Sequence, residues 1–425
     1  MQFEKRSVPR EAADTTEVRR IVSEILSAVE REGVSAVRRY SERFDRWSPA
    51  TFRVSDAEIM ASRDAVAPEL VRDIDFARDQ VSGFAEHQRA MFRDIEVETL
   101  PGVTLGHRNI PVAQVGAYVP GGRYPLISSA LMTIAVPRVA GVGRIVAVAP
   151  PRPGHGGIDP AQLYAMTAAG ADEILCIGGV QALAAMAFGI DDAPPLNAVD
   201  MVVGAGNMYV AEAKRQIFGT VGIDLLAGPT EVLVIADEAA DPRVVAADLL
   251  GQAEHGPTSA TVLVTTSRGL ADAVLREVDD LLKAWPTAGV ARESWAAYGE
   301  VIVCDDDEEV VRVSDRIASE HVEVQTADPD WYLARLTNYG SLFLGANATV
   351  VYGDKAIGTN HVLPTERAAR YTGGLWVGKF IKTVTYQRVS DAANLVVAPV
   401  AAAIADAEGM AGHAITARIR LGDRP

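Results

Sequence analysis

The chain has 425 residues, more than one ordinary domain holds, so two or more lobes that share a cleft are expected. Its 48% apolar and 23% charged residues are typical of a globular protein and exclude a largely disordered chain. The net charge of −16, without a basic cluster, argues against nucleic acid as a partner, because phosphate binding needs concentrated Lys and Arg. A few local cations could still bind a small anionic substrate.

The ends of the chain and its two cysteines predict a cytoplasmic protein that does not bind membranes. The first residues are charged where a signal peptide needs an apolar segment, and no apolar run reaches the roughly 20 residues that span a membrane. Cys176 and Cys304 lie in or at the end of apolar, strand-like runs, which favours buried free thiols over a disulfide. Any metal site must therefore use His, carboxylate or amide ligands.

The hydrophobic pattern changes its period along the chain. Residues from about 11 to 95 indicate helices, with apolar residues three and four apart. From about 100 to 240, apolar runs at 145–149, 173–177, 198–203 and 231–235 alternate with helix-like stretches. This alternation predicts a parallel sheet with helices on both faces. A second series follows, with strands expected at 260–265, 300–304 and 341–344.

The predicted fold class is therefore α/β, with two Rossmann-like lobes that have parallel-sheet cores. We expect an N-terminal helical segment (1–100), a first lobe (101–240), a second lobe (241–375) and a C-terminal tail (376–425). Ligands bind at the carboxyl ends of strands in such sheets. Glycine-bearing turns at 178–181 and 204–207 are expected there, but neither has the full dinucleotide fingerprint. Tight turns and phosphate binding remain equally good interpretations of them.

Polar clusters in the second half of the chain are candidates for a metal site. Gln252 and His255 are three residues apart at the end of a helix that begins near Asp241, so both can point at one metal ion. Asp354 and His361 lie on a predicted loop. A lone residue of this kind is more often a helix cap or a solvated group. Together, however, they offer the His, amide and carboxylate ligands that an open zinc site can use.

Two further clusters contain residues suited to proton transfer and metal binding. Glu320 and His321 are predicted to close a helix that starts near Glu308, and they offer two adjacent proton-transfer groups. His413 follows Glu408 near the C-terminus. Acidic residues beside His are commonly solvated faces of helices, so the spacing leaves both interpretations open.

At these residues the sequence resembles the histidinol dehydrogenase family along nearly its whole length. The matching segments, in order, are 118–122, 227–237, 252–257 (Gln-Ala-Glu-His-Gly-Pro), 320–321 and 358–365 (Gly-Thr-Asn-His-Val-Leu-Pro-Thr). The resemblance implies a zinc- and NAD-dependent enzyme. Such an enzyme oxidises a small primary alcohol through the aldehyde to the carboxylate and uses two NAD.

The resemblance also implies roles for the matched residues. The expected zinc ligands are Gln252, His255, Asp354 and His413. The family forms a homodimer with intertwined C-terminal tails, so His413 is expected to enter the partner subunit's site. A neutral His321 would take the hydroxyl proton, Glu320 would activate water, and His361 would orient the substrate. The nicotinamide cofactor is expected near Tyr118, Gln181 and Asn207.

The chain departs from the family pattern near the expected substrate. Val350 stands where biosynthetic members carry a Glu that meets a cationic substrate, and Thr230 stands where Ser is usual. A lost carboxylate and added Arg and Lys favour an anionic substrate, unless these bases are solvated or pair across the dimer. The residues expected to contact the substrate are Thr230, Glu408, Arg123, Arg367, Arg370 and Lys379.

The segment 371–380, Tyr-Thr-Gly-Gly-Leu-Trp-Val-Gly-Lys-Phe, looks like that of sulfopropanediol 3-dehydrogenases. These enzymes oxidise (R)-2,3-dihydroxypropane-1-sulfonate to sulfolactate, so a sulfonated or similarly anionic polyol is the expected substrate. L-Histidinol is the alternative. A zinc hydrolase would use a similar metal and Glu base without nicotinamide. A non-catalytic NAD-binding paralogue would have lost some matched residues, and all of them are present here.

Overall fold

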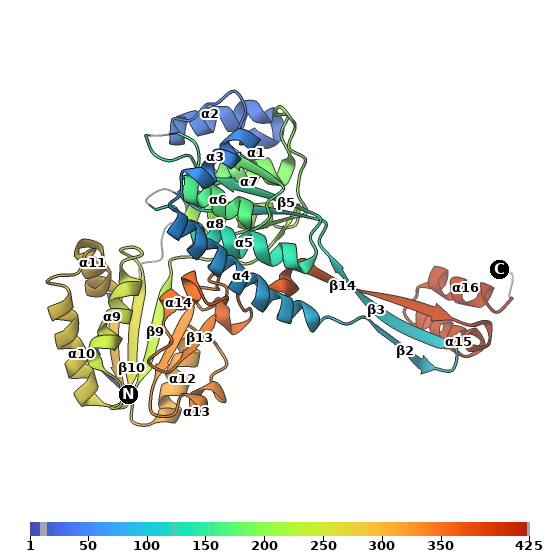
Figure 1. Cartoon of the computed structure of the whole chain (residues 1–425). Coiled ribbons are helices and arrows are strands. Elements are labelled where there is room, and N and C mark those ends of the chain that lie inside the picture. Colours follow the sequence, from blue (N-terminus) through green and yellow to red (C-terminus); the bar gives the residue numbers. More distant parts are fainter. Residues whose placement is uncertain (9–14, 122–123, 155, 423–425) are drawn as a thin grey trace.

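The computed structural model describes residues 1–8, 15–121, 124–154 and 156–422, which form two α/β lobes and a long arm that projects from them (Figure 1). The predicted α/β fold with parallel-sheet cores is confirmed. Both cysteines are buried and free, as expected. Among the described helices, none is long and apolar enough to cross a membrane.

The first lobe is built on a five-stranded parallel sheet in the order β6-β5-β4-β7-β8. Its strands are β4 (Gln114–Tyr118), β5 (Arg144–Ala149), β6 (Glu173–Cys176), β7 (Met201–Val203) and β8 (Gly222–Ile223). Along β5, Ile145 and Ala147 pack on one side, and Val146 and Val148 pack on the other. This alternation explains the continuous apolar runs in the sequence, because both faces of the sheet are covered.

Two sets of helices cover the first sheet. One face packs against α1 (Thr16–Glu32), α2 (Val34–Asp45), α7 (Gly179–Phe188) and α8 (Met208–Ile217). The other face packs against α4 (Pro68–Ala90), α5 (Ile127–Ala140) and α6 (Pro160–Ala168), with α3 (Asp56–Asp64) next to α6. The N-terminal helices therefore belong to the first lobe.

The second lobe has a six-stranded sheet in the order β1-β11-β10-β9-β12-β13, in which only the edge strand β1 is antiparallel. Its strands are β1 (Gln2–Lys5), β9 (Glu231–Ala236), β10 (Ala260–Thr265), β11 (Gly299–Val303), β12 (His321–Gln325) and β13 (Ser341–Leu344). Its helices are α9 (Pro242–Ala253), α10 (Arg268–Leu281), α11 (Ala288–Tyr298), α12 (Asp307–Ile317), α13 (Pro329–Leu333) and α14 (Val350–Lys355).

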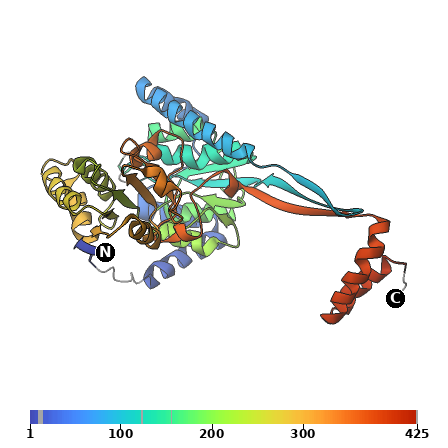
Figure 2. The same ribbon diagram turned by 90° about the horizontal axis from the view of Figure 1, so that it is seen from below.

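A three-stranded antiparallel ribbon forms the arm, and two helices form its tip (Figure 2). The ribbon consists of β2 (Ile95–Leu100), β3 (Val103–Pro111) and β14 (Ile381–Val389), and the tip of α15 (Asp391–Ala407) and α16 (Ala411–Ile419). Short 3-10 helices, η1 (Ala368–Arg370) and η2 (Val377–Phe380), precede the return strand. At the tip, Leu395, Val396, Val400 and Ile404 are each more than half exposed. Such a surface is typical of an interface with another chain.

Several elements differ from the sequence-based expectation. Residues 1–100 do not form a separate segment, because β1 joins the second sheet and β2 joins the arm. Glu320 and His321 do not close a helix: α12 ends at Ile317, Ala318 adopts a left-handed conformation, and His321 begins β12. Asp354 lies on the short helix α14 and not on a loop. Strand β7 begins only at Met201.

Candidate active site

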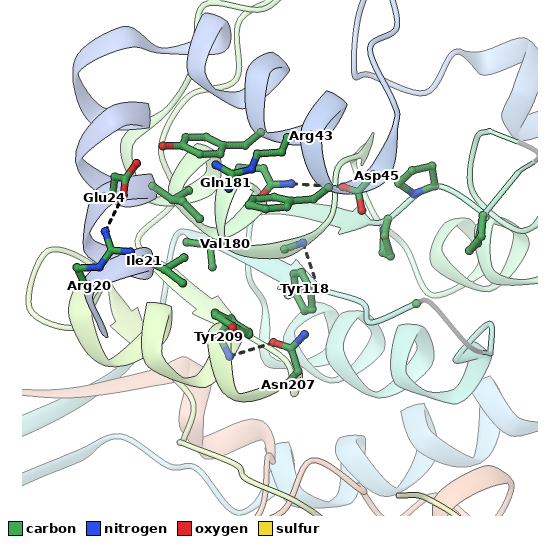
Figure 3. Close-up of a pocket in the computed structure, with 18 of the residues that line it drawn as sticks. Arg20, Ile21, Glu24, Arg43, Asp45, Tyr118, Val180, Gln181, Asn207 and Tyr209 are labelled. Atoms are coloured by element: carbon green, nitrogen blue, oxygen red, sulfur yellow. Dashed lines mark hydrogen bonds and ion pairs between the residues drawn. The ribbon is translucent and has the colours of Figure 1, made fainter. Parts of the chain in front are cut away.

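A pocket of about 630 Å³ opens at the carboxyl ends of β4, β6 and β7 in the first lobe (Figure 3). Tyr118 ends β4, Gln181 lies in the first turn of α7, and Asn207 caps α8, so the structure brings these three residues to one pocket. The Gly179 amide donates to the Tyr118 hydroxyl at 3.3 Å, and burial raises the pKa of Tyr118 to about 12. Helices α1 and α2 supply the opposite wall.

Two polar groups in this pocket are available to a ligand. The Gln181 carboxamide donates through Nε2 to Asp45 Oδ2 at 3.3 Å, while its buried Oε1 has no hydrogen-bond partner in the described part of the chain. Burial raises the pKa of Asp45 above its ordinary value. Buried polar atoms normally have partners, so the free Oε1 indicates a donor that the chain itself does not supply.

The second lobe contains a buried relay of polar side chains. Gln252, in the last turn of α9, donates through Nε2 to Thr230 Oγ1. The Thr230 hydroxyl donates to Glu320 Oε2 at 2.5 Å, and the Glu231 amide donates to the same oxygen at 3.0 Å. Burial raises the pKa of Glu320 above its usual value, although these donors and His321 oppose the shift. A buried carboxyl group beside an imidazole is suited to proton transfer.

His321 lies between two carboxylates. Its Nδ1 is 3.0 Å from the Glu231 carbonyl and 3.5 Å from Glu320 Oε2. A carbonyl only accepts, so Nδ1 carries the hydrogen and Nε2 is left as the basic atom of the neutral ring. Nε2 is buried, has no hydrogen-bond partner among the described residues, and lies 3.7 Å from Asp354 Oδ1. Burial lowers the pKa of His321, but Glu320 and Asp354 outweigh it and raise this pKa to about 9.

Asp354 is the centre of the charged groups in the cluster. Burial raises the pKa of Asp354, but the opposing effects of His321, His361 and Lys355 outweigh it. The pKa of Asp354 is therefore well below its usual range. Lys355 Nζ lies 3.6 Å from Asp354 Oδ2, and the Asp354 backbone carbonyl is 3.1 Å from His361 Nδ1. His361 Nε2 is 2.9 Å from the hydroxyl of Ser129, which lies on α5 of the first lobe. The cluster is therefore at the junction of the two lobes.

Of the four expected zinc ligands, Gln252, His255 and Asp354 lie in the second lobe, in or near the polar cluster. His255 follows Gln252 directly after α9, and burial lowers its pKa while the nearby Asp354 carboxylate opposes this shift. His413 is exposed on α16 at the arm tip, away from both lobes (Figure 2). Among the described residues, no three His, Cys, Asp or Glu side chains form a group that could hold a metal. One imidazole, one carboxylate and one amide nevertheless fit three positions of a tetrahedral zinc site.

The expected substrate residues are scattered. Thr230 belongs to the polar relay, whereas Glu408 is exposed at the arm tip, where it follows α15. Arg367 and Arg370 are exposed at η1, and Arg370 Nε donates to the Arg367 carbonyl. Arg123 lies outside the described residues.

Lys379 and Lys355 differ in their relation to the cluster. Lys379 Nζ donates to Thr372 Oγ1 at 2.9 Å, and burial lowers the pKa of Lys379. Lys355, which the sequence analysis missed, lies beside Asp354, and its side chain is 49% exposed. Its position directly after Asp354 in the sequence was the available signal. Asp45 and Ser129 were also missed, and nothing in their local sequence marks them.

Residues 8–421 match the family described as histidinol dehydrogenase. A histidinol dehydrogenase homolog from Shouchella clausii is 52% identical over 95% of this chain and 94% of that protein. A sulfopropanediol 3-dehydrogenase from Ruegeria pomeroyi is 47% identical over 99% of this chain and 96% of that protein. The crystal structure of histidinol dehydrogenase from Elizabethkingia anophelis has a TM-score of 0.91 at 34% identity, covering 98% of this chain and 94% of that chain.

Proposed function

The chain belongs to the histidinol dehydrogenase family, whose members are dehydrogenases, and we propose that it is a zinc- and NAD-dependent enzyme that oxidises a small primary alcohol to the carboxylate. The observation that carries this proposal is the position of His321, whose free Nε2 faces Asp354 while Nδ1 is fixed by a backbone carbonyl. Glu320, beside it, supplies a second proton-transfer group.

Two oxidation steps follow from these residues. His321 Nε2 accepts the proton of the substrate hydroxyl, and NAD bound in the first-lobe pocket would supply the acceptor for the hydride from the carbon, which leaves the aldehyde. Glu320 then accepts a proton from water, whose oxygen adds to the aldehyde carbon. The oxygen of the former aldehyde takes back the proton from His321, and the hydrate forms. A second NAD would supply the acceptor for its hydride, the two hydroxyl protons pass to His321 and to solvent, and the product leaves as the carboxylate. His361, held between Ser129 and the Asp354 carbonyl, has a fixed ring that can orient the substrate.

Zinc would be held by Gln252, His255 and Asp354 of one chain, since Gln252 donates through Nε2 and keeps its amide oxygen for a ligand bond. Bound there, the cation would polarise the substrate hydroxyl and offset the negative charge that holds the pKa of His321 at about 9. His321 would then be the neutral base that the first step needs.

NAD is proposed to bind in the first-lobe pocket near Tyr118, Gln181 and Asn207. The pocket volume of about 630 Å³ is typical of cofactor sites, and the unpartnered Gln181 Oε1 can accept a hydrogen bond from the cofactor. Helix α5, which contributes Ser129 to the polar cluster, follows β4 and Tyr118 in the chain. The two sites are thus linked through one segment.

A homodimer is proposed to complete the metal site. His413 and Glu408 lie on the arm, where an apolar tip surface would be covered by a second copy. One chain provides three of the four ligands of a tetrahedral site, and His413 of the partner subunit would provide the fourth. Glu408 would reach the same site from the arm.

The substrate is proposed to be anionic, most simply (R)-2,3-dihydroxypropane-1-sulfonate, which would be oxidised to sulfolactate. Lys355 is a half-exposed cation beside Asp354, and Val350 puts an apolar side chain at the start of the same helix. The relative named sulfopropanediol 3-dehydrogenase supports this choice. L-Histidinol is the second candidate, because a histidinol dehydrogenase from Rhizobium meliloti is 43% identical over 95% of the chain.

A coupled assay tests the function. Purified, zinc-loaded protein is given NAD with either alcohol, and reduced nicotinamide is followed together with the acid product. We expect two reduced nicotinamides per molecule of sulfonate and a much lower kcat/KM for histidinol. Turnover of histidinol alone would overturn the anionic substrate. No reduced nicotinamide with either alcohol, in dimeric protein that holds zinc, would contradict the dehydrogenase and favour a hydrolase or a non-catalytic protein.

A further inference from the structure

Two carboxyl groups, those of the partly buried Asp248 and the buried Glu323, lie next to the candidate active site without contributing to it. Asp248 precedes Gln252 by one turn of α9, so the two side chains share a face of the helix. Glu323 follows His321 by two residues on β12, so these two side chains share a face of the strand. Glu323 is completely buried.

Both carboxyl groups bind the start of helix α14. Glu323 Oε1 accepts a hydrogen bond from the Val350 amide at 2.9 Å, and Asp248 Oδ1 accepts one from the Thr349 hydroxyl at 3.1 Å. Gln325 Nε2 joins them, since it donates to Asp248 Oδ2 at 2.7 Å and to Glu323 Oε2 at 3.2 Å. The pair therefore connects α9, β12 and α14, the elements that carry Gln252, His321 and Asp354.

This connection can fix the position of helix α14. Helix α14 has only six residues and no side-chain cap at Thr349, so its own hydrogen bonds cannot fix its position. Among the described ion pairs, none includes Asp248 or Glu323, and two adjacent carboxylates without a counter-charge favour sharing one proton. A buried polar network of this kind costs free energy unless all its members are satisfied, but it specifies geometry.

We propose that Asp248 and Glu323 are positioning residues that hold α14 so that Asp354 stays beside His321 and Gln252. The proposal rests on the proposed function, in which Asp354 is a metal ligand. The pair does not touch substrate or metal. It acts through the backbone amide of Val350 and the hydroxyl of Thr349, four and five residues before Asp354.

Variants at Glu323 test this role. Glu323→Gln keeps an oxygen that accepts from the Val350 amide, whereas Glu323→Leu removes it. We expect zinc affinity, measured by chelator competition on the dimer, to fall about 10- to 100-fold in Glu323→Leu, as for other groups that orient metal ligands. Glu323→Gln should stay within about 3-fold, and NAD affinity should be unchanged in both. Zinc affinity of Glu323→Leu equal to wild type would overturn the proposal.

Amide hydrogen exchange of the metal-free protein gives a second readout that does not depend on function. Exchange in residues 349–356 should accelerate in Glu323→Leu but not in Thr261→Val, a matched change of a buried polar residue on β10, which β9 separates from β12 in the same sheet. If Glu323→Leu does not fold, Thr349→Val removes only the bond to Asp248 and should show a smaller change of the same sign. Equal exchange in folded variants would contradict the proposal. Failure of the wild type to bind zinc would instead overturn the proposed function.

Discussion

The two lobes hold their candidate functional groups in different ways. The first lobe has an open pocket that a single chain lines with α1, α2, β4, α7 and α8. Tyr118, Gln181 and Asn207 all reach this pocket. In the second lobe, Gln252 and Asp354 contact different members of one polar cluster, and His413 lies on α16 at the end of an arm. Under the proposed function, nucleotide binding would be a property of the monomer, whereas the metal site would require association of two chains.

The two sites also differ in charge. At the first, the Gly179 amide donates to Tyr118, and the first free amides of α8 donate to Asn207 Oδ1. These three amides are thus already engaged, and Gln181 Oε1 and the Asp45 carboxylate are acceptors for ligand hydroxyl or amide groups. The second site gathers Glu320 and Asp354, whose negative charges favour a cation.

The largest expected effect concerns the shared metal site. His413→Ala should remove zinc and activity, and His321→Ala should lower kcat about 10²- to 10⁴-fold through loss of the base. When the two variants are mixed and dimers re-form, about a quarter of the wild-type activity should return, because half of the dimers are mixed and each has one intact site. NAD affinity, measured by calorimetry, should stay the same in both. Mixed dimers without recovered activity would show that each chain holds its own complete site.

A smaller effect is expected from Lys355. Lys355→Met should lower kcat/KM for dihydroxypropane sulfonate about 10- to 100-fold, since a hydrogen bond to a charged group contributes about 1.5–3 kcal/mol. The kcat/KM for the uncharged 1,2-propanediol should change little, and the kcat/KM for histidinol should rise. Lys379→Met is the matched control, because Lys379 is engaged by Thr372 and should change neither. An equal loss of kcat/KM for charged and uncharged alcohols would mean that Lys355 acts only through its ion pair with Asp354 and does not bind the substrate.

The sequence predicted the polar residues well and their spatial setting less well. Strands such as 145–149 and 260–265 were predicted correctly, because buried parallel strands leave continuous apolar runs. Glu320 and His321 were identified but assigned to a helix, since a single left-handed residue, Ala318, ends α12 without a glycine. Local pattern contains no signal for a left-handed alanine, whose conformation is fixed by tertiary packing.

The sequence did not predict which segments far apart in the chain lie side by side. The sequence analysis predicted neither strand β1, which lies in the segment expected to be helical, nor its pairing with β11, about 300 residues away. The same holds for β14, which pairs with β3 and so makes the arm. The basic residues were sought in 366–382, where Lys and Arg are dense, whereas Lys355 became a candidate only when α14 placed it beside the cluster. The chemical character of individual residues was therefore easier to predict than which residues lie close together in space.

In the first lobe, Asp45 should affect the nucleotide alone. Asp45→Ala removes the acceptor of Gln181 Nε2 and a half-buried carboxylate, so NAD affinity should fall about 10-fold, the effect of one charge-assisted hydrogen bond. Zinc affinity should be unchanged. Glu24→Ala is the control, because Glu24 lines the same pocket but is paired with Arg20. An equal loss of zinc affinity in Asp45→Ala would contradict the expectation that the two sites bind their ligands independently.

The smallest effect concerns how each lobe compensates buried charge. The first lobe pairs the buried Asp224 with Lys214. In the second lobe, Asp248 and Glu323 have no ion-pair partner among the described residues and accept hydrogen bonds only from the neutral groups of Gln325, Thr349 and Val350. Burial, together with Asp248, raises the pKa of Glu323 to about 8, while an unfolded Glu has a pKa of about 4.3. Between these values the folded state keeps a proton that the unfolded state releases, so stability is highest at low pH and is lost as pH rises towards 8.

Glu323→Gln cannot ionise and should remove this loss. We expect its Tm to equal that of wild type near pH 5 and to exceed it by a few degrees at pH 9, as measured by thermal unfolding of the metal-free protein. Glu238→Gln, a change of an exposed carboxylate, should give the same difference from wild type at both pH values. A Tm difference for Glu323→Gln that does not grow with pH would mean that Glu323 is already ionised at neutral pH. The second lobe would then tolerate an ionised buried Glu323 beside the partly buried Asp248 without a positively charged partner, whereas the first lobe neutralises its buried Asp224 with Lys214.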